Sequence, residues 1–383
     1  MSKTKYFLYP ILLLLSLSIG CSTKASTKNS ISGEIKSLPK GALQLILEED
    51  INRKKSRIIA EIPVDEKGRF KFEKELQPHI YSLKINDKKS VTLAVAKGQN
   101  IIITGDAADS NKLQVTGSED TAKLEAYEKF RKESLGRLVI SIRNQIKELK
   151  EKHTPENDSK FLELAKLEIE NYDRHKDELI EFIKKEMGTS VAIYPTSLRW
   201  DGEKNIPFLI GLAKQFDSAH PQTEIAARIN EKVKAITANS IGGKVAEIRM
   251  PDKNGEIVSL TSIKAKYILI DFWGSWCPPC RRESRLLGEL YQKFKPEGFE
   301  IYSVGLESEK EAWLKAIERD KRIWTNVSTF QEFETPVTFD YAVTSLPANV
   351  LVDNSGKVIA RNLHGNELEA AVEKLFSSQK QMH

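Results

Sequence analysis

The feature that most constrains this chain of 383 residues is a buried strand that runs into two cysteines and then a helix. The apolar run at residues 267–272 has the length of a strand covered on both faces. Gly274 and Ser275 interrupt it. After Arg281 the apolar side chains recur with a helical period, at Leu286, Leu287, Leu290, Tyr291 and Phe294. The Cys277-Pro278-Pro279-Cys280 motif is therefore predicted at a helix N-terminus.

This position determines the chemistry of the two thiols. A thiol is a nucleophile only as its thiolate, and the unpaired N–H groups and the dipole of a helix N-terminus stabilise that anion. We expect Cys277 at the exposed tip and Cys280, three residues further on, beneath it and within disulfide reach. The pair can then cycle between dithiol and disulfide without a large backbone motion.

Other uses of a Cys-x-x-Cys motif can be weighed against redox activity. A zinc site needs two more Cys or His ligands, but the chain has only one other cysteine, Cys21, and six scattered histidines. A c-type haem needs His directly after the second Cys, where this chain has Arg281. A purely structural disulfide is a remaining alternative, although closing so short a loop contributes little stability. The context of strand, Trp-Cys and helix favours a redox-active pair that needs no metal and no other cofactor.

Residues 271–283 read Asp-Phe-Trp-Gly-Ser-Trp-Cys-Pro-Pro-Cys-Arg-Arg-Glu. This segment resembles the active site of the thioredoxin superfamily, and most closely its TlpA/ResA-like branch of membrane-anchored thiol–disulfide oxidoreductases. The resemblance covers about residues 243–376. It implies an α/β thioredoxin-like C-terminal domain, assigned to residues 243–383, and the alternation of strands and helices there agrees with that fold.

The resemblance also suggests which residues contact a substrate. Leu346 and Pro347 match the segment whose cis-proline faces the disulfide, and they would shape the groove that pairs with a client backbone. A trans proline at the start of a strand is the alternative. Trp276, Pro278 and Pro279 are expected to contact the client in the same groove.

Two carboxylates are candidates for accepting the proton of the resolving cysteine. Asp271 lies on the buried strand, where a carboxylate must be paired or protonated and its pKa should be raised. It matches the buried Asp of thioredoxins, and an Asp hydrogen-bonded at the strand end is the alternative. Glu283 follows Cys280 by one helical turn and matches the active-site Glu of ResA-like proteins, although a first-turn Glu also suits the helix dipole. The assignment stays open between them.

The implied reaction is thiol–disulfide exchange with client proteins. Cys277 attacks a client disulfide, and Cys280 then releases the reduced client. The two central prolines offer no N–H and no cation to the Cys277 thiolate, which favours the disulfide form and a reducing enzyme. Arg281 and Arg282 oppose this effect, more weakly if they are solvated. A disulfide oxidase or isomerase, and a non-enzymatic anchored scaffold lipoprotein, remain as alternatives.

The N-terminus predicts export. A mostly apolar run at residues 7–19 follows two lysines and is too short for a comfortable membrane span, which suits a signal peptide at residues 1–20. Residues 17–21, Leu-Ser-Ile-Gly-Cys, resemble the lipobox of bacterial lipoproteins and imply lipidation of Cys21 and a periplasmic location. Secretion with a free Cys21 is the alternative. Residues 21–30, rich in Ser, Thr, Lys and Asn, are expected to form a tether.

Lipidation of Cys21 would leave Cys277 and Cys280 as the only thiols of an exported chain, which favours an exchange role over a structural one. The expected partners are client proteins with disulfides and a membrane or periplasmic thiol electron donor. The net charge of +5 is spread along the chain, with no basic block dense enough to suggest nucleic acid.

Two further units are predicted ahead of the redox domain. Short apolar stretches separated by turn signals predict a small antiparallel β-domain at residues 31–118, a sandwich or a barrel. Its pattern resembles the β-domain of unknown function that often precedes TlpA-like modules. His79, beside Pro78, is expected in a turn. Residues 121–238 carry Glu, Lys and Leu with a helical period and predict a helical region, for which partner binding or dimerisation is a hypothesis only.

Overall fold

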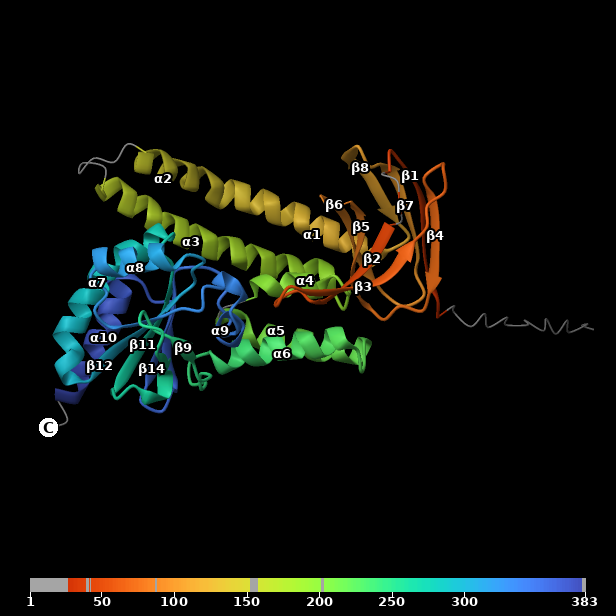
Figure 1. Cartoon of the computed structure of the whole chain (residues 1–383). Helices are drawn as coiled ribbons and strands as arrows, with labels where there is room; N and C mark the ends of the chain where they lie inside the picture. Colours follow the sequence, from red (N-terminus) through yellow and green to blue (C-terminus); the bar gives the residue numbers. More distant parts are fainter. Residues whose placement is uncertain are drawn as a thin grey trace, which may run out of the picture.

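The computed structural model describes residues 27–38, 41, 43–86, 88–151, 158–200 and 203–380. The predicted signal peptide, Cys21 and most of the tether lie outside the described residues. A β-sandwich forms one end of the molecule, an α/β domain forms the other, and helices connect the two (Figure 1). No helix in the described ranges is long and apolar enough to cross a membrane.

The N-terminal unit is a sandwich of two four-stranded sheets, with strand orders β4-β1-β7-β8 and β3-β2-β5-β6. The strands are β1 Asn29–Lys36, β2 Leu43–Asp50, β3 Lys55–Ile62, β4 Arg69–Lys74, β5 His79–Asn86, β6 Lys89–Val95, β7 Asn100–Asp106 and β8 Asp109–Thr116. Ile31, Leu45 and Leu83 are fully buried between the sheets. All the strand pairs are antiparallel except β1 and β7, because the chain crosses to the other sheet between them.

The expectation for His79 is wrong. It is fully buried at the start of β5, with its ring centre 5.4 Å from that of Tyr194 in the helical unit. The sandwich therefore packs on the helices through this strand end.

The middle unit consists of a long helical hairpin and a shorter pair of helices. Its elements are α1 Glu119–Leu135, η1 Gly136–Ile140, α2 Ser141–Glu151, α3 Asp158–Phe182, η3 Ile183–Met187, α4 Ile193–Thr196, η4 Ser197–Arg199, η5 Glu203–Asn205, α5 Ile206–Ala219 and α6 Glu224–Ala238. Ser118 begins the hairpin as the N-cap of α1, where its side chain accepts a hydrogen bond from the Thr121 N–H at 3.0 Å. The hairpin extends from the sandwich to the α/β domain along one side, with α5 and α6 on the other (Figure 1).

The C-terminal unit is a five-stranded mixed sheet, β13-β12-β11-β14-β15, with helices on both faces. Its elements are β9 Arg249–Pro251, β10 Ile257–Ser259, η6 Leu260–Ser262, β11 Tyr267–Trp273, α7 Pro278–Phe294, η7 Lys295–Glu297, β12 Phe299–Gly305, α8 Lys310–Arg319, β13 Thr325–Val327, η8 Glu332–Glu334, α9 Pro336–Asp340, β14 Ala348–Asp353, β15 Val358–Arg361 and α10 Gly365–Lys380. In the central strand β11, Leu269 packs toward α7 and α10, whereas Ile270 packs on the opposite face. Burial on both faces explains the continuous apolar run.

The turn between β2 and β3 reaches the C-terminal unit. The Arg53 guanidinium lies 4.1 Å from the centre of the Phe339 ring on α9. The same guanidinium pairs with Asp50 and with Glu231 of α6, each at 2.8 Å. Lys54 forms an ion pair with Glu334. The sandwich is thus attached to both of the other units.

Candidate functional site

The two cysteines form a disulfide at the first turn of α7, with Cα atoms 5.3 Å apart. Cys277 is the N-cap residue, and its sulfur accepts a hydrogen bond from the Cys280 N–H at 3.3 Å. Pro278 and Pro279 are the first two helical residues, where a missing N–H leaves no intrahelical bond unmade. The helix therefore directs one N–H at the sulfur of Cys277.

Cys277 is buried in the disulfide form, so the expectation that it lies at an exposed tip is wrong. The residue is only 3% exposed. Both cysteines pack in one cluster with Trp273 and Trp313, and Leu346 covers part of it. Trp313 comes from α8 and Leu346 from the loop before β14, so the burial depends on two distant segments.

The peptide bond between Leu346 and Pro347 is cis. These two residues, with Trp276 and Pro279, line a cavity of about 430 Å³, here called the shared cavity. Trp276 is half exposed and anchors its ring by donating a hydrogen bond from Nε1 to the Leu306 carbonyl at 2.8 Å. The structure thus brings four of the five predicted substrate-contact residues together, whereas Pro278 is not part of the cavity lining.

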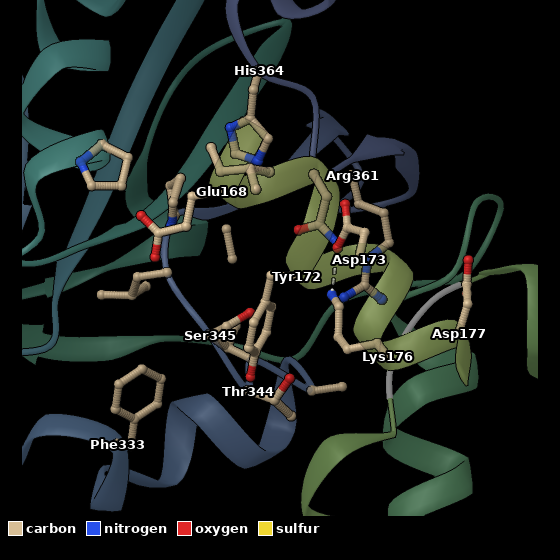
Figure 2. Close-up of a pocket in the computed structure, with 18 of the residues that line it drawn as sticks. Glu168, Tyr172, Asp173, Lys176, Asp177, Phe333, Thr344, Ser345, Arg361 and His364 are labelled. Carbon is tan, nitrogen blue, oxygen red and sulfur yellow. Dashed lines mark ion pairs between the residues drawn. The ribbon is translucent and has the colours of Figure 1, made fainter. Parts of the chain in front are cut away.

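The opposite wall of the shared cavity comes from the helical unit. Glu168, Tyr172, Asp173 and Lys176 of α3 line it, and Figure 2 shows the Tyr172 ring pointing from the helix toward Thr344 and Ser345. Lys176 pairs with Asp173 at 2.8 Å. No pattern in the sequence predicts that this helix lies over the loop of the cis-proline.

Asp271 lies in a sealed group of polar side chains on β11 and its neighbours. It forms an ion pair with Arg322 and accepts a hydrogen bond from Ser303 Oγ at 2.8 Å. Arg322 also donates to Ser284 Oγ at 2.5 Å and stacks 3.9 Å from the centre of the Trp273 ring. We call these residues, with Trp324, the Arg322 cluster.

Burial raises the pKa of the Asp271 carboxyl, and the charge of Arg322 opposes this effect. The side chain of Arg322 is 0% exposed and that of Asp271 5%, so neither meets solvent. A carboxylate in this position is paired rather than free, which is one of the two states that burial on a strand allows.

Glu283 lies in a different environment, because it pairs with a histidine. Its Oε1 is 3.1 Å from His364 Nδ1, and it accepts a hydrogen bond from the Gly365 N–H at 3.3 Å. Burial by itself lowers the pKa of His364. The hydrogen bond to Glu283 and the charge of Glu283 together raise this pKa by more, so it lies above its ordinary value. His364 lines the shared cavity, so the Glu283–His364 pair reaches solvent.

Charged residues also hold the turn before Cys277 and the helix after it. Buried Glu307 accepts hydrogen bonds from Ser275 N–H and Oγ at 2.6 and 2.7 Å. Arg281 pairs with Asp320, with an Nη2–Oδ1 distance of 2.7 Å. Arg282 lies 4.1 Å from the centre of the Phe161 ring on α3.

Neither arginine is therefore freely solvated. Burial lowers the pKa of Arg282 to about 10. The charge of Arg281 is offset by its partner Asp320, with which it is half-buried. Arg281 therefore gives a thiolate at Cys277 little support, because the charge of Asp320 offsets its own.

The geometry defines what this site can do. A cysteine pair at a helix N-terminus, beside a cavity and close in the chain to the carboxylates of Asp271 and Glu283, supports two-electron exchange between a dithiol and a disulfide. Among the described residues, no group of three or more His, Cys, Asp or Glu side chains is placed to hold a metal ion.

Comparisons with known proteins agree with this chemistry. Residues 241–361 match the AhpC/TSA family. The thiol-disulfide oxidoreductase ResA of Bacillus thuringiensis subsp. konkukian is 30% identical over 142 residues, which are 35% of this chain and 75% of that protein. ResA of Geobacillus thermodenitrificans is 33% identical over 122 residues, 32% of this chain and 68% of that protein.

This chain belongs to the ResA-like thiol–disulfide oxidoreductases. The predicted family, enzyme class and thioredoxin-like C-terminal fold are confirmed. Residues 30–124 of this oxidoreductase match a domain of unknown function (DUF4369), which is the predicted extra β-domain. A crystal structure of the thioredoxin domain of a Bacteroides vulgatus thiol-disulfide oxidoreductase is 38% identical, covering 36% of this chain and 97% of that one, with a TM-score of 0.34.

Two residues of the oxidoreductase site escaped the sequence analysis. Arg322 follows Lys321, whose φ of 52° ends α8 in a left-handed residue. The Arg322 N–H then bonds the Ile317 carbonyl at 3.0 Å, a helix-ending motif that turns the arginine inward. A buried Asp271 requires a cationic partner, which is the one feature that pointed to an arginine or lysine in the site. Nothing in the sequence distinguished Arg322 from nearby surface charges as that partner.

His364 gave no signal, because it is a lone histidine in a polar loop. Asn349 on β14 fixes that loop, donating to the Leu363 carbonyl at 2.6 Å and accepting from the Leu363 N–H at 3.2 Å. This buried amide places His364 against Glu283.

Proposed function

We propose that this oxidoreductase reduces disulfides of client proteins outside the cytoplasm, through its Cys277–Cys280 dithiol, while a lipid at Cys21 holds it to a bacterial membrane. The observation that carries the redox part is the cysteine pair at the start of α7, beside a cavity lined by the cis-proline Pro347. The anchor rests on the lipobox-like residues 17–21 alone.

The reaction has two exchange steps. The Cys277 thiolate attacks one sulfur of the client disulfide, forms a mixed disulfide, and releases the other client sulfur as a thiolate that takes up a proton. The Cys280 thiolate then attacks the Cys277 sulfur, which releases the second client thiol. Two electrons have passed to the client, and a thiol donor must reduce the enzyme disulfide again.

We assign the deprotonation of Cys280 to Glu283 rather than to Asp271. Glu283 lies one helical turn after Cys280 on the same face, and its partner His364 borders the shared cavity. Asp271 is already bonded to Arg322 and Ser303, away from solvent. A proton taken by Glu283 can leave through His364 to water, whereas one taken by Asp271 must cross a packed core.

Two features support the reducing direction. The two prolines after Cys277 supply no N–H to its thiolate, and the Cys280 N–H is the one hydrogen-bond donor that reaches the sulfur among the described residues. Arg281 is paired with Asp320, which offsets its charge. When little stabilises the Cys277 thiolate, the disulfide is the more stable form of the enzyme. The reduced enzyme therefore tends to pass its two electrons to the client.

The decisive measurement is the reduction potential of the cysteine pair, obtained by equilibration in glutathione buffers, alkylation and mass analysis. We expect a value well below roughly −200 mV, the range of enzymes that reduce their clients. A value near about −120 mV, where the strong oxidant DsbA lies, would instead make this protein an oxidase or isomerase.

Cysteine variants separate an enzyme from a scaffold. Cys277→Ser should abolish insulin reduction by dithiothreitol, and Cys280→Ser should accumulate mixed disulfides with the client. A scaffold would not accelerate insulin reduction in any form, and multiple turnovers in either variant would refute the two-step mechanism.

The lipid anchor has a separate test. Expression of the full chain in a bacterial host with radiolabelled palmitate should label the wild type and place it in the membrane fraction. Cys21→Ala should lose both the label and the membrane association. Equal labelling of the variant would exclude Cys21 as the lipidation site.

A further inference from the structure

The shared cavity is built by two units of the chain, and its two walls differ. The α/β domain contributes Trp276, Pro279, Phe333 and the loop at residues 342–348, and α3 contributes the wall that contains Tyr172. The Trp276 and Phe333 rings lie with their centres 6.3 Å apart. One side of the cavity is therefore aromatic and continuous with the turn that carries Cys277.

The wall from α3 presents an aromatic ring set among charges that have partners. Glu168 pairs with Arg143 at 2.7 Å, and Asp173 pairs with Lys176 at 2.8 Å. Arg143 and Lys176 each lie 5.7 Å from the centre of the Tyr172 ring. The charges of this wall are thus largely neutralised within the helical unit, and the ring is its main apolar surface.

Tyr172 is placed to contact a bound molecule. Its side chain is partly exposed, and Figure 2 shows the ring directed at Thr344 and Ser345. Within the described ranges, no other residue hydrogen-bonds its hydroxyl group. A tyrosine with a free hydroxyl and a fixed ring offers a large contact area at a low cost in conformational entropy.

The dimensions of the cavity limit what can enter. Its volume of about 430 Å³ is in the range of small-ligand sites, roughly 300–1,000 Å³. A folded domain cannot fit between α3 and the cis-proline loop, but a single extended chain can. Because the lining pairs aromatic groups with neutralised charges, an apolar side chain beside the reacting cysteine matches it better than a charged one.

We propose that α3 forms the second wall of the client site, and that Tyr172 selects extended cysteine-bearing segments with an apolar residue next to the cysteine. The inference rests on the proposed reductase function and adds its substrate class. The helical unit is then a specificity device for the redox domain.

The first test compares disulfide substrates that differ only beside the cysteine. Two short peptides, one with Leu and one with Gly next to its single Cys, are each linked to glutathione as a mixed disulfide. For the wild-type chain we expect kcat/KM to be about tenfold higher for the Leu peptide, or about 1.4 kcal/mol. In Tyr172→Ala this ratio should fall close to one.

Two further variants make the result specific. Tyr172→Phe keeps the ring and should retain most of the preference. Lys166→Ala, on the same helix with a side chain 81% exposed and outside the cavity lining, should keep the wild-type ratio. An unchanged preference in Tyr172→Ala would overturn the proposal, as would an equal loss in Lys166→Ala.

A second measurement does not depend on rates. In a Cys280→Ser chain, which holds the client as a mixed disulfide, a photo-crosslinking phenylalanine analogue replaces Tyr172 or Lys166. Irradiation should crosslink the Leu peptide from position 172 and not from position 166. A trapped peptide that does not crosslink from position 172 would overturn the role of α3.

Failure of the proposed function has a different signature. Hydroxyethyl disulfide has no peptide to recognise, so its reduction by the wild-type chain reports only the cysteine chemistry. If neither it nor any peptide is reduced, the reductase function is refuted. If hydroxyethyl disulfide is reduced while the two peptides react at equal rates, the reductase function is retained. Only the proposed specificity for an apolar neighbour is then refuted.

Discussion

The two carboxylates beside the disulfide occupy opposite environments. Asp271 is sealed in the Arg322 cluster, with an arginine that is itself completely buried. Glu283 is bonded to His364 at the rim of the shared cavity. Both have a cationic partner, but only one of the partners can release its proton at physiological pH.

This difference indicates a division of labour. The Asp271 carboxylate is held by Arg322 and by Ser303 of the neighbouring strand β12, so it ties these segments together beside the redox turn. The Glu283 carboxylate can pass a proton to His364, which lines the shared cavity. The first arrangement suits structure and the second suits proton transfer.

The largest expected effect is the loss of Arg322. Arg322→Ala leaves the Asp271 carboxylate buried without its cation, which should lower the free energy of unfolding by roughly 3–5 kcal/mol. Urea denaturation at neutral pH measures it. The matched control is Arg285→Ala, whose side chain is 90% exposed and whose loss should change stability by no more than about 0.5 kcal/mol. A loss below about 1 kcal/mol for Arg322→Ala would show that the cluster is not structural.

The second prediction concerns rate. Glu283→Gln should slow the attack of Cys280 on the mixed disulfide by about 100-fold, the usual contribution of a positioned general base. Asp271→Asn should slow this step much less, although it disturbs the fold more. Single-turnover release of reduced client, followed by rapid acid quenching, measures both. Equal slowing by the two variants would contradict the assignment of proton transfer to Glu283 and of a structural role to Asp271.

The smallest effect is the pH dependence of stability. Because the pKa of His364 is raised in the folded protein, its pairing with Glu283 stabilises the fold fully below about pH 6.5 and is lost as pH rises through the raised pKa. The difference in unfolding free energy between wild type and Glu283→Gln should therefore shrink from about pH 6 to pH 9. A difference that grows over this range would contradict the pairing.

His175 in α3 has the opposite effect on the pH dependence of stability. Burial lowers its pKa to about 4, and it lies 2.8 Å from Ser134 Oγ. The unfolded chain binds a proton that the folded chain rejects between about pH 6.5 and 4, so this residue reduces stability as pH falls. His175→Gln should flatten the acid side of the stability profile, whereas Glu283→Gln should alter the neutral and alkaline side.

The sequence predicted what depends on local pattern. The apolar run of β11, the cysteines at the start of α7, and the proline opposite them follow from period, turn residues and a resemblance carried by residues 271–283. The placement of Asp271 on a buried strand also followed, since a carboxylate inside an apolar run must be buried.

Contacts between distant segments were not predictable in the same way. Arg322 and His364 reach the site through a left-handed residue and an amide-fixed loop, and neither leaves a periodic signal. The burial of Cys277 depends on Trp313 of α8, and the second wall of the cavity depends on how α3 packs over the α/β domain. Such arrangements are set by tertiary packing, which a pattern along the chain does not encode.

The contact between the β2–β3 turn and the C-terminal unit has a consequence for assembly. Lys54 and Glu334 are 280 positions apart, so loop-closure entropy opposes their contact until the units between them have folded. We therefore expect the two ends of the molecule to dock late in folding. The shared cavity likewise needs two separate units, because α3 and the cis-proline loop line it together. The second wall of the client site thus depends on packing between units far apart in the sequence, and not on the fold of the redox domain alone.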